Sequence, residues 1–109
     1  MFSNKYRLRN TTEIAKVFKI GKYVHGKYIF IKYIPNKQET VRIAISVSTK
    51  MFKQAVKRNR IKRLLRESIQ PHLTTLPNLD ILIIAKKELT MDTLAKDINA
   101  DIKKIFRKL

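Results

Sequence analysis

The sequence predicts an α/β (α+β) fold, a two-layer sandwich of helices on a sheet, and two observations lead to it. The chain has 109 residues, 44% of them hydrophobic, which suits a single domain, residues 1–109, around one core. The spacing of its apolar residues switches along the chain between the period of a helix and that of a strand, and the resulting order of elements is αββαβα.

The first helix follows residues 1–10, a basic segment that we expect to be a flexible arm. Thr11 or Thr12 is the candidate N-cap of this helix, because a hydroxyl can accept the free backbone N–H groups of a first turn. Gly21 is its expected end, so the helix is short.

Three strands are expected. Side chains alternate in Lys27–Ile34 and again in Val41–Ser48, so each segment has an apolar face. We expect these two strands to pair as a hairpin through residues 35–40. The third, Leu79–Ala85, is almost continuously apolar, which is typical of a central strand covered on both faces.

Two longer helices complete the prediction. One is expected from Lys53 to Gln70, where Pro71 ends it, and its apolar stripe is Ile61, Leu64, Leu65 and Ile69. The other is expected to start at Thr90 as its cap and to run to Leu109. Its apolar stripe is Met91, Leu94, Ala95, Ile98, Ile102, Ile105, Phe106 and Leu109.

The charge of the chain predicts its kind of partner. There are 25 lysines and arginines against 8 acids, a formal net charge of +17, so the protein attracts polyanions. Nucleic acid is the leading partner, and an anionic membrane surface is the second. The absence of cysteine excludes disulfides, thiolate zinc sites and thiol nucleophiles. With no signal-like start and no apolar run able to span a bilayer, we expect a cytoplasmic protein without a membrane partner.

The predicted second helix concentrates this charge. Its segment KQAVKRNRIKRLLR, residues 53–66, carries seven basic side chains and no acid. We interpret it as a surface for RNA phosphates. The alternative is a solvated charged face without a ligand. This alternative is less favoured because the segment has no acids that could form i,i+4 ion pairs.

A second candidate site lies on the predicted sheet. Tyr28, Phe30 and Lys32 share one strand face, the neighbouring strand offers small side chains, and Phe18 can close the side. Aromatic rings beside a lysine are suited to unpaired nucleotides, although ordinary core packing is the alternative. The candidate cleft residues are Phe18, Tyr28, Phe30, Lys32, Ser46, Ser48 and Lys50.

The acidic side chains do not suggest a nuclease site. Asp92, Asp97 and Asp101 are spread along the predicted last helix among lysines, so we expect surface ion pairs rather than a metal site. Glu67 is expected to pair with a neighbouring base. The two histidines have no ligand partners nearby in the sequence, so no catalytic or metal-binding residue is assigned.

The motif KRNRIKRLLRE at Lys57–Glu67, which follows a strand ending in SVSTK at Ser46–Lys50, resembles the protein subunit of bacterial ribonuclease P. The likeness includes KVFKIGK, Lys16–Lys22, and covers nearly the whole chain. It implies a ribosomal protein S5 domain 2-like fold with a left-handed β-α-β crossover, whereas the general rule favours the right-handed form.

The resemblance also implies a function. In that family the protein assists an RNA subunit, the catalyst, which requires Mg²⁺ and removes the 5′ leader of precursor transfer RNA. One protein per RNA is expected, and the cleft residues above would hold the leader. The residues implied to bind the catalytic RNA are Lys53, Lys57, Arg58, Asn59, Arg60, Lys62, Arg63 and Arg66. The alternative function is that of a structural RNA-binding protein of ribosomal type.

Overall fold

A computed structural model describes residues 3–90 and 92–109 of the chain. Its α-helices are α1 Thr11–Ile20, α2 Ala55–Ile69 and α3 Ala95–Phe106. Its strands are β1 Lys22–His25, β2 Ile29–Pro35, β3 Arg42–Ser46 and β4 Leu79–Ala85. Two short 3-10 helices are η1 Asn4–Tyr6 and η2 Gln70–His72. The strands form one sheet in the order β1-β2-β4-β3. Only the β3–β4 pair is parallel in the described residues, and the other two pairs are antiparallel. The predicted α/β class is confirmed.

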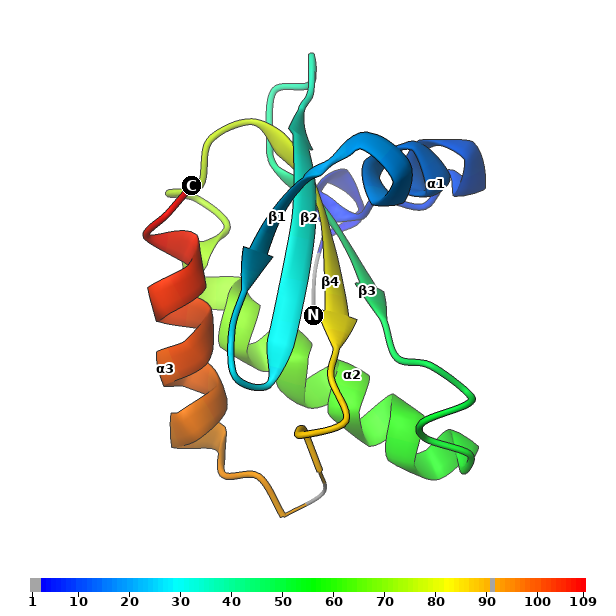
Figure 1. Ribbon diagram of the computed structural model, residues 1–109. Helices are drawn as coiled ribbons and strands as arrows, with labels where there is room; N and C mark the ends of the chain where they lie inside the picture. The colour runs from blue at the N-terminus through cyan, green and yellow to red at the C-terminus, as the bar shows by residue number, and fades with distance from the viewer. Residues whose placement is uncertain (1–2, 91) are drawn as a thin grey trace.

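Strand β4 lies inside the sheet, as its apolar sequence predicts. Ile81 and Ile83 face the larger core, which α2 and α3 cover. Leu82 faces the opposite side and packs with Val17 of α1. Helix α1 therefore lies on one face of the sheet, and α2 and α3 lie on the other (Figure 1).

The β3–α2–β4 unit joins two neighbouring parallel strands. In the view of Figure 1 both strands run downward, and the chain passes behind the sheet in α2 as it moves leftward from β3 to β4. That sense is left-handed, as the family resemblance implies. Helix α2 therefore crosses behind the sheet from the side of β3 toward α3, and it packs against both the sheet and α3 (Figure 1).

The predicted hairpin is wrong. Strand β2 pairs with β1 and β4, and β3 pairs with β4 alone among the described strands. Alternation reveals which face a side chain occupies but not which strand lies beside it. The unpredicted strand β1 turns into β2 at Gly26, whose N–H donates to the carbonyl of Ile29 at 2.9 Å. A Cβ atom at Gly26 would lie 2.7 Å from Asp101 Oδ1, and this carboxylate is held by the N–H groups of Lys27 and Tyr28, so a side chain at this position would disturb the turn.

Two helix starts also differ from prediction. The side chain of Asn10, rather than Thr11 or Thr12, caps α1 by accepting the N–H groups of Thr12 and Glu13. Helix α3 starts at Ala95, with Leu94 as its N-cap, and not at Thr90. The N–H of Thr90 instead donates to Thr93 Oγ1 at 2.9 Å in a local turn, a competition with the helix that threonine favours. The expected stripe residue Met91 lies outside the described residues.

The N-terminal segment, expected to be a flexible arm, lies against the protein from residue 3 onward. Leu8 is buried, and its N–H donates to the carbonyl of Ile43 at 3.0 Å. The Thr40 hydroxyl donates to the carbonyl of Lys5 at 3.1 Å. Residues 3–10 therefore cover part of the β3 edge.

Candidate RNA interface

The outer side of α2 carries an exposed, strongly basic surface. Ile61, Leu65 and Ile69 are buried against the sheet and α3, so the residues between them point outward. We call Asn59, Arg60, Lys62, Arg63 and Arg66 the basic face of α2. The helix phase predicted from the sequence is correct.

Most of the positive charge on this face has no internal partner. Arg63 is bonded to Glu67 through Nε and Oε1 at 3.3 Å, the pair predicted for Glu67, but the two side chains are 78% and 63% exposed. An ion pair so open to water contributes little and exchanges readily. Within the described residues, Arg60, Lys62 and Arg66 form no ion pair. The basic face is thus free to bind a polyanion.

Arg58 has a different position from the rest of the predicted set. Its Nη1 donates to the carbonyls of Phe52 at 2.8 Å and Lys53 at 3.0 Å, which closes the turn before α2. The N-cap residue Gln54 makes no side-chain capping bond, so the side chain of Arg58, rather than that of the N-cap residue, holds this turn in place. Lys57 and Lys53 are exposed at the same end of the helix.

Helix α1 and strand β2 bring Phe18, Lys32 and Phe30 to one side of the sheet. Lys32 Nζ lies 4.4 Å from the centre of the Phe18 ring and donates to the Phe18 carbonyl at 2.7 Å. The Phe30 ring lies 5.2 Å from that of Tyr23 on β1. Phe18 and Tyr23 are 52% and 53% exposed, so their rings are open to a ligand. We call Phe18, Tyr23, Phe30 and Lys32 the aromatic surface.

Not every predicted cleft residue joins this surface. Tyr28 packs against the larger core, beneath Lys27, whose Nζ lies 5.2 Å from its ring. Ser46, at the end of β3, is exposed. Ser48 accepts the N–H of the exposed residue Lys50 at 3.1 Å in the following turn.

Sequence reasoning missed Tyr23 and His25 because it missed β1. The signal was present, since Tyr23 and Val24 favour strands and Gly26 marks a turn. The Tyr23 hydroxyl lies 3.0 Å from His25 Nδ1, and Lys86 Nζ lies 3.3 Å from His25 Nε2. The His25 ring thus connects Tyr23 on β1 with Lys86, which follows β4.

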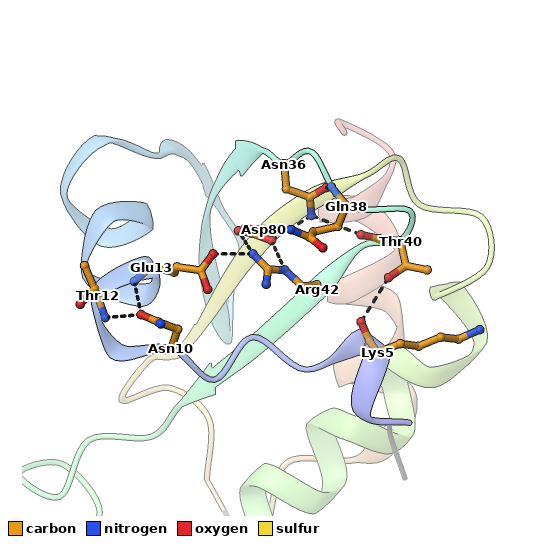
Figure 2. A network of polar contacts seen from close by, with 9 residues as sticks. All are labelled: Lys5, Asn10, Thr12, Glu13, Asn36, Gln38, Thr40, Arg42 and Asp80. Carbon is orange, nitrogen blue, oxygen red and sulfur yellow. Dashed lines mark hydrogen bonds and ion pairs between the residues drawn. The ribbon is translucent and has the colours of Figure 1, made fainter.

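A polar network fixes α1 over the sheet (Figure 2). Arg42 of β3 lies between Glu13 of α1 and Asp80 of β4, with contacts of 2.8 Å to each carboxylate. Hydrogen bonds to Asp80 and then to Glu13 raise the pKa of the Arg42 guanidinium, which therefore stays protonated. The network holds the helix that carries Phe18, and so sets the position of one side of the aromatic surface.

The buried carboxylates are already satisfied. Asp80 is bonded to Arg42, and Asp101 accepts the N–H groups of Lys27 and Tyr28 at 2.9 Å each. The predicted surface ion pair is therefore wrong for Asp101, which instead joins α3 to the β1–β2 turn. No group of three His, Cys, Asp or Glu side chains suited to a metal ion occurs in residues 3–90 and 92–109. Over the same residues, no helix has the length and apolar character needed to cross a membrane.

Comparison with known proteins finds relatives over nearly the full length. The family model for ribonuclease P matches residues 2–109. The chain is 34% identical to the ribonuclease P protein component of Clostridioides difficile over 109 residues, which is 98% of this chain and 94% of that one. It is 32% identical to the ribonuclease P protein component of Azoarcus sp. over 108 residues, 99% of this chain and 89% of that one.

Solved structures give the same result for the fold. The ribonuclease P protein of Staphylococcus aureus superimposes with a TM-score of 0.80 at 27% identity, covering 94% of each chain. That of Thermotoga maritima reaches 0.85 at 24% identity, covering 94% of this chain and 96% of the other. The resemblance drawn from KRNRIKRLLRE is confirmed by these matches.

Proposed function

Since this chain belongs to the ribonuclease P protein family, we propose that it binds the RNA subunit of ribonuclease P and the 5′ leader of precursor transfer RNA. Family membership places it in a ribonuclease complex that processes transfer RNA. The division of labour between its two surfaces follows from their chemistry.

The basic face of α2 is the contact for the RNA subunit. It offers guanidinium groups that suit phosphate oxygens and few hydrogen-bonding groups that read base edges. A folded RNA presents many phosphates to one rigid helix, so a straight, acid-poor face is well matched to it. The single observation that carries this assignment is that Arg60, Lys62 and Arg66 have no ion-pair partner among the described residues.

The aromatic surface is the contact for the leader. Exposed rings stack on unpaired bases of any sequence, and a lysine between them attracts the backbone. Lys32 uses one of its three N–H donors on the Phe18 carbonyl, so others remain for a phosphate. Leaders of different sequence are accommodated because stacking does not distinguish bases.

The protein does not carry out the cleavage in this proposal. The two buried carboxylates, Asp80 and Asp101, are occupied by an arginine and by backbone N–H groups, so neither suits Mg²⁺ as a ligand. The magnesium ions that the complex requires are assigned to the RNA. The protein contributes positive charge and a binding surface for substrate.

Reconstitution is the direct test. Precursor transfer RNA is incubated with the RNA subunit at low magnesium, with and without this protein, and cleavage at the 5′ end is measured. Stimulation by the protein, together with no cleavage by the protein alone, is the expected result. Binding to the RNA subunit without stimulation would favour a structural RNA-binding protein of ribosomal type, which the comparisons do not favour.

A further inference from the structure

A groove of about 590 Å³ lies between the N-terminal segment and the loop that joins β2 to β3, residues 36–41. Asn4, Lys5 and Arg7 line one side of it, and residues 37–40 together with Arg42 line the other. We call this space the loop groove. It shares no residue with the basic face of α2 or with the aromatic surface.

The loop groove has more positive charge than its acids balance. Among the described residues, Lys5, Arg7 and Lys37 form no ion pair. Arg42 differs from them, because two carboxylates of the polar network already hold it. Glu39 is the one acid in the lining, so three unpaired cations surround a space that contains a single carboxylate. Such a space attracts an anion.

Hydrogen bonds hold the lining in place and leave these cations unused. The Asn36 side chain accepts the N–H of Gln38 at 3.0 Å and donates to the carbonyl of Thr40 at 3.2 Å, which closes the loop on itself. The Thr40 hydroxyl donates to the carbonyl of Lys5 at 3.1 Å and fixes the N-terminal segment beside the loop (Figure 2). This bond uses the backbone of Lys5, so its ammonium group stays available. A site arranged in advance loses less conformational freedom when it binds a ligand.

The positive charge of the loop groove continues toward the basic face of α2. Arg7 also lines a smaller pocket of about 310 Å³, and Arg66 of the basic face lines the same pocket. Tyr6, between the groove residues Lys5 and Arg7, packs against the core that α2 and α3 cover. One basic surface therefore extends from α2 across the N-terminal segment to the β2–β3 loop.

The charge changes sign in the direction of α1. Glu13 and Asp80 line a separate pocket between α1 and the β2–β3 loop. These two carboxylates stand between the loop groove and the helix that carries Phe18 of the aromatic surface. A polyanion in the loop groove is therefore better placed to reach α2 than to reach the aromatic surface.

We propose that the loop groove binds backbone phosphates of the RNA subunit, so that the contact with this RNA extends from the basic face of α2 to the β2–β3 loop. Ammonium and guanidinium groups suit phosphate oxygens. In the described part of the chain no aromatic side chain lines the groove, so it offers no surface on which an unpaired base could stack. This inference rests on the proposed function and adds a binding site to it.

The test is the affinity of the full-length protein for the RNA subunit over a salt series. Lys5→Gln/Lys37→Gln removes two exposed cations from the groove and none of the hydrogen bonds that hold the loop. The matched control is Lys104→Gln/Lys108→Gln, which removes the same charge from exposed positions on and after α3. Comparison with this control separates a local contact from a general loss of net charge.

Glu39→Gln tests the same site with the opposite sign. It removes the acid of the groove, so the affinity for the RNA subunit should rise by about two- to threefold. Glu88→Gln, which removes an exposed acid from the segment after β4, is its control and should stay at the wild-type value. A gain of affinity does not arise from a damaged fold, so this variant decides the question if Lys5→Gln/Lys37→Gln melts at a lower temperature than wild type.

For the lysine double variant we expect an affinity about five- to tenfold below that of its control. The slope of log affinity against log salt should be smaller in magnitude by about 1 to 2. The assembled complex should bind precursor and mature transfer RNA in the wild-type ratio, because the leader does not enter the groove.

Three results would each overturn the inference: affinity and slope equal to those of the control, no gain from Glu39→Gln over Glu88→Gln, or a loss confined to precursor binding. The last would place the leader, rather than the RNA subunit, in the groove. If the wild-type protein does not bind the RNA subunit at all, the proposed function itself is wrong. That outcome is distinct from the other three, in which the wild-type protein binds.

Discussion

Arg42 and Asp80 are joined by two parallel hydrogen bonds, Nε to Oδ1 at 2.9 Å and Nη2 to Oδ2 at 2.8 Å. Asp80 Oδ1 also accepts the side-chain amide of Asn36 at 2.8 Å. A bidentate pair of this kind fixes direction as well as distance. It locks β3 to β4 at the end of the sheet where Arg42 also reaches Glu13 of α1 (Figure 2).

The two acids of this network are expected to differ in their effect on stability. The side chain of Asp80 is 6% exposed and that of Glu13 is 41% exposed. Asp80→Ala leaves a mostly buried guanidinium short of a partner and should lower the free energy of unfolding by about 3 kcal/mol. Glu13→Ala should lower it by at most about 1 kcal/mol, because that contact is open to water. Chemical denaturation measures both, and equal losses would show that Asp80 is not the principal partner.

His72 should make stability depend on pH. Its ring packs edge-on against Phe106 with centres 5.3 Å apart, and burial, followed by the charge of Lys103, lowers its pKa from the ordinary value of 6.5. Below pH 6.5 the unfolded chain binds a proton at His72 more readily than the folded chain does. The contribution of neutral His72 to folding stability is therefore complete above pH 6.5 and is lost as pH falls through the lowered pKa. Wild type should therefore lose more stability than His72→Gln between about pH 7.5 and pH 5.5. Parallel stability curves for the two proteins would contradict the assignment.

Local pattern was sufficient to predict most helices and strands of this fold. The spacing of Ile61, Leu65 and Ile69 gave the phase of α2, and the unbroken apolar run of β4 gave its central place. The order of strands was not predictable in the same way, because pairing depends on contacts between segments far apart in the chain. Strand β1 was missed since it has four residues and only one of them, Val24, packs against the core.

The candidate site was likewise predictable where it depends on one element and not where it depends on contacts between distant segments. The basic face of α2 follows from one helix and its period, so the sequence predicted its exposure. Tyr28 was placed on the wrong side because the β1–β2 turn is held by Asp101, a residue more than seventy positions away. The pocket lined by Arg7, Arg9 and Arg66 combines residues of four segments, the N-terminal segment, α1, β3 and α2, and no local signal in the sequence links Arg9 to Arg66.

The exposed arginines of α2 should control assembly with the RNA subunit. Arg60→Ala and Arg63→Ala should each weaken binding by on the order of 1 kcal/mol, as loss of a charge-assisted contact does. The Arg63–Glu67 pair is too exposed to prevent this contact. If about six cations of the helix neutralise phosphates, log affinity should fall against log salt with a slope of roughly −4 to −5.

Filter binding over a salt series measures both quantities. Lys104→Ala on α3 is a suitable control, because it removes one exposed charge from another helix. Unchanged affinity in the Arg60→Ala/Arg63→Ala double variant would exclude the basic face as the contact, as would a slope near zero.

Tyr23 and Tyr28 allow the aromatic surface to be tested separately from the core. Tyr23 is exposed beside Phe30, whereas Tyr28 packs against the core under α2 and α3. Tyr23→Ala should weaken binding of leader-bearing precursor by on the order of 1 kcal/mol, the effect of losing one stacked base. Mature transfer RNA should bind as before, because it has no leader. Phe30→Ala and Lys32→Ala should show the same selectivity for the precursor.

Tyr28→Ala is the matched control for this experiment, since it removes the same kind of side chain from the neighbouring turn between β1 and β2. It should change the melting temperature without selecting between precursor and mature transfer RNA. Binding of both RNAs by the reconstituted complex, measured side by side for the two tyrosine variants, distinguishes a leader contact from a packing defect. Should Tyr23→Ala weaken both RNAs equally, or should Tyr28→Ala be the variant that selects between them, the leader does not lie on the aromatic surface.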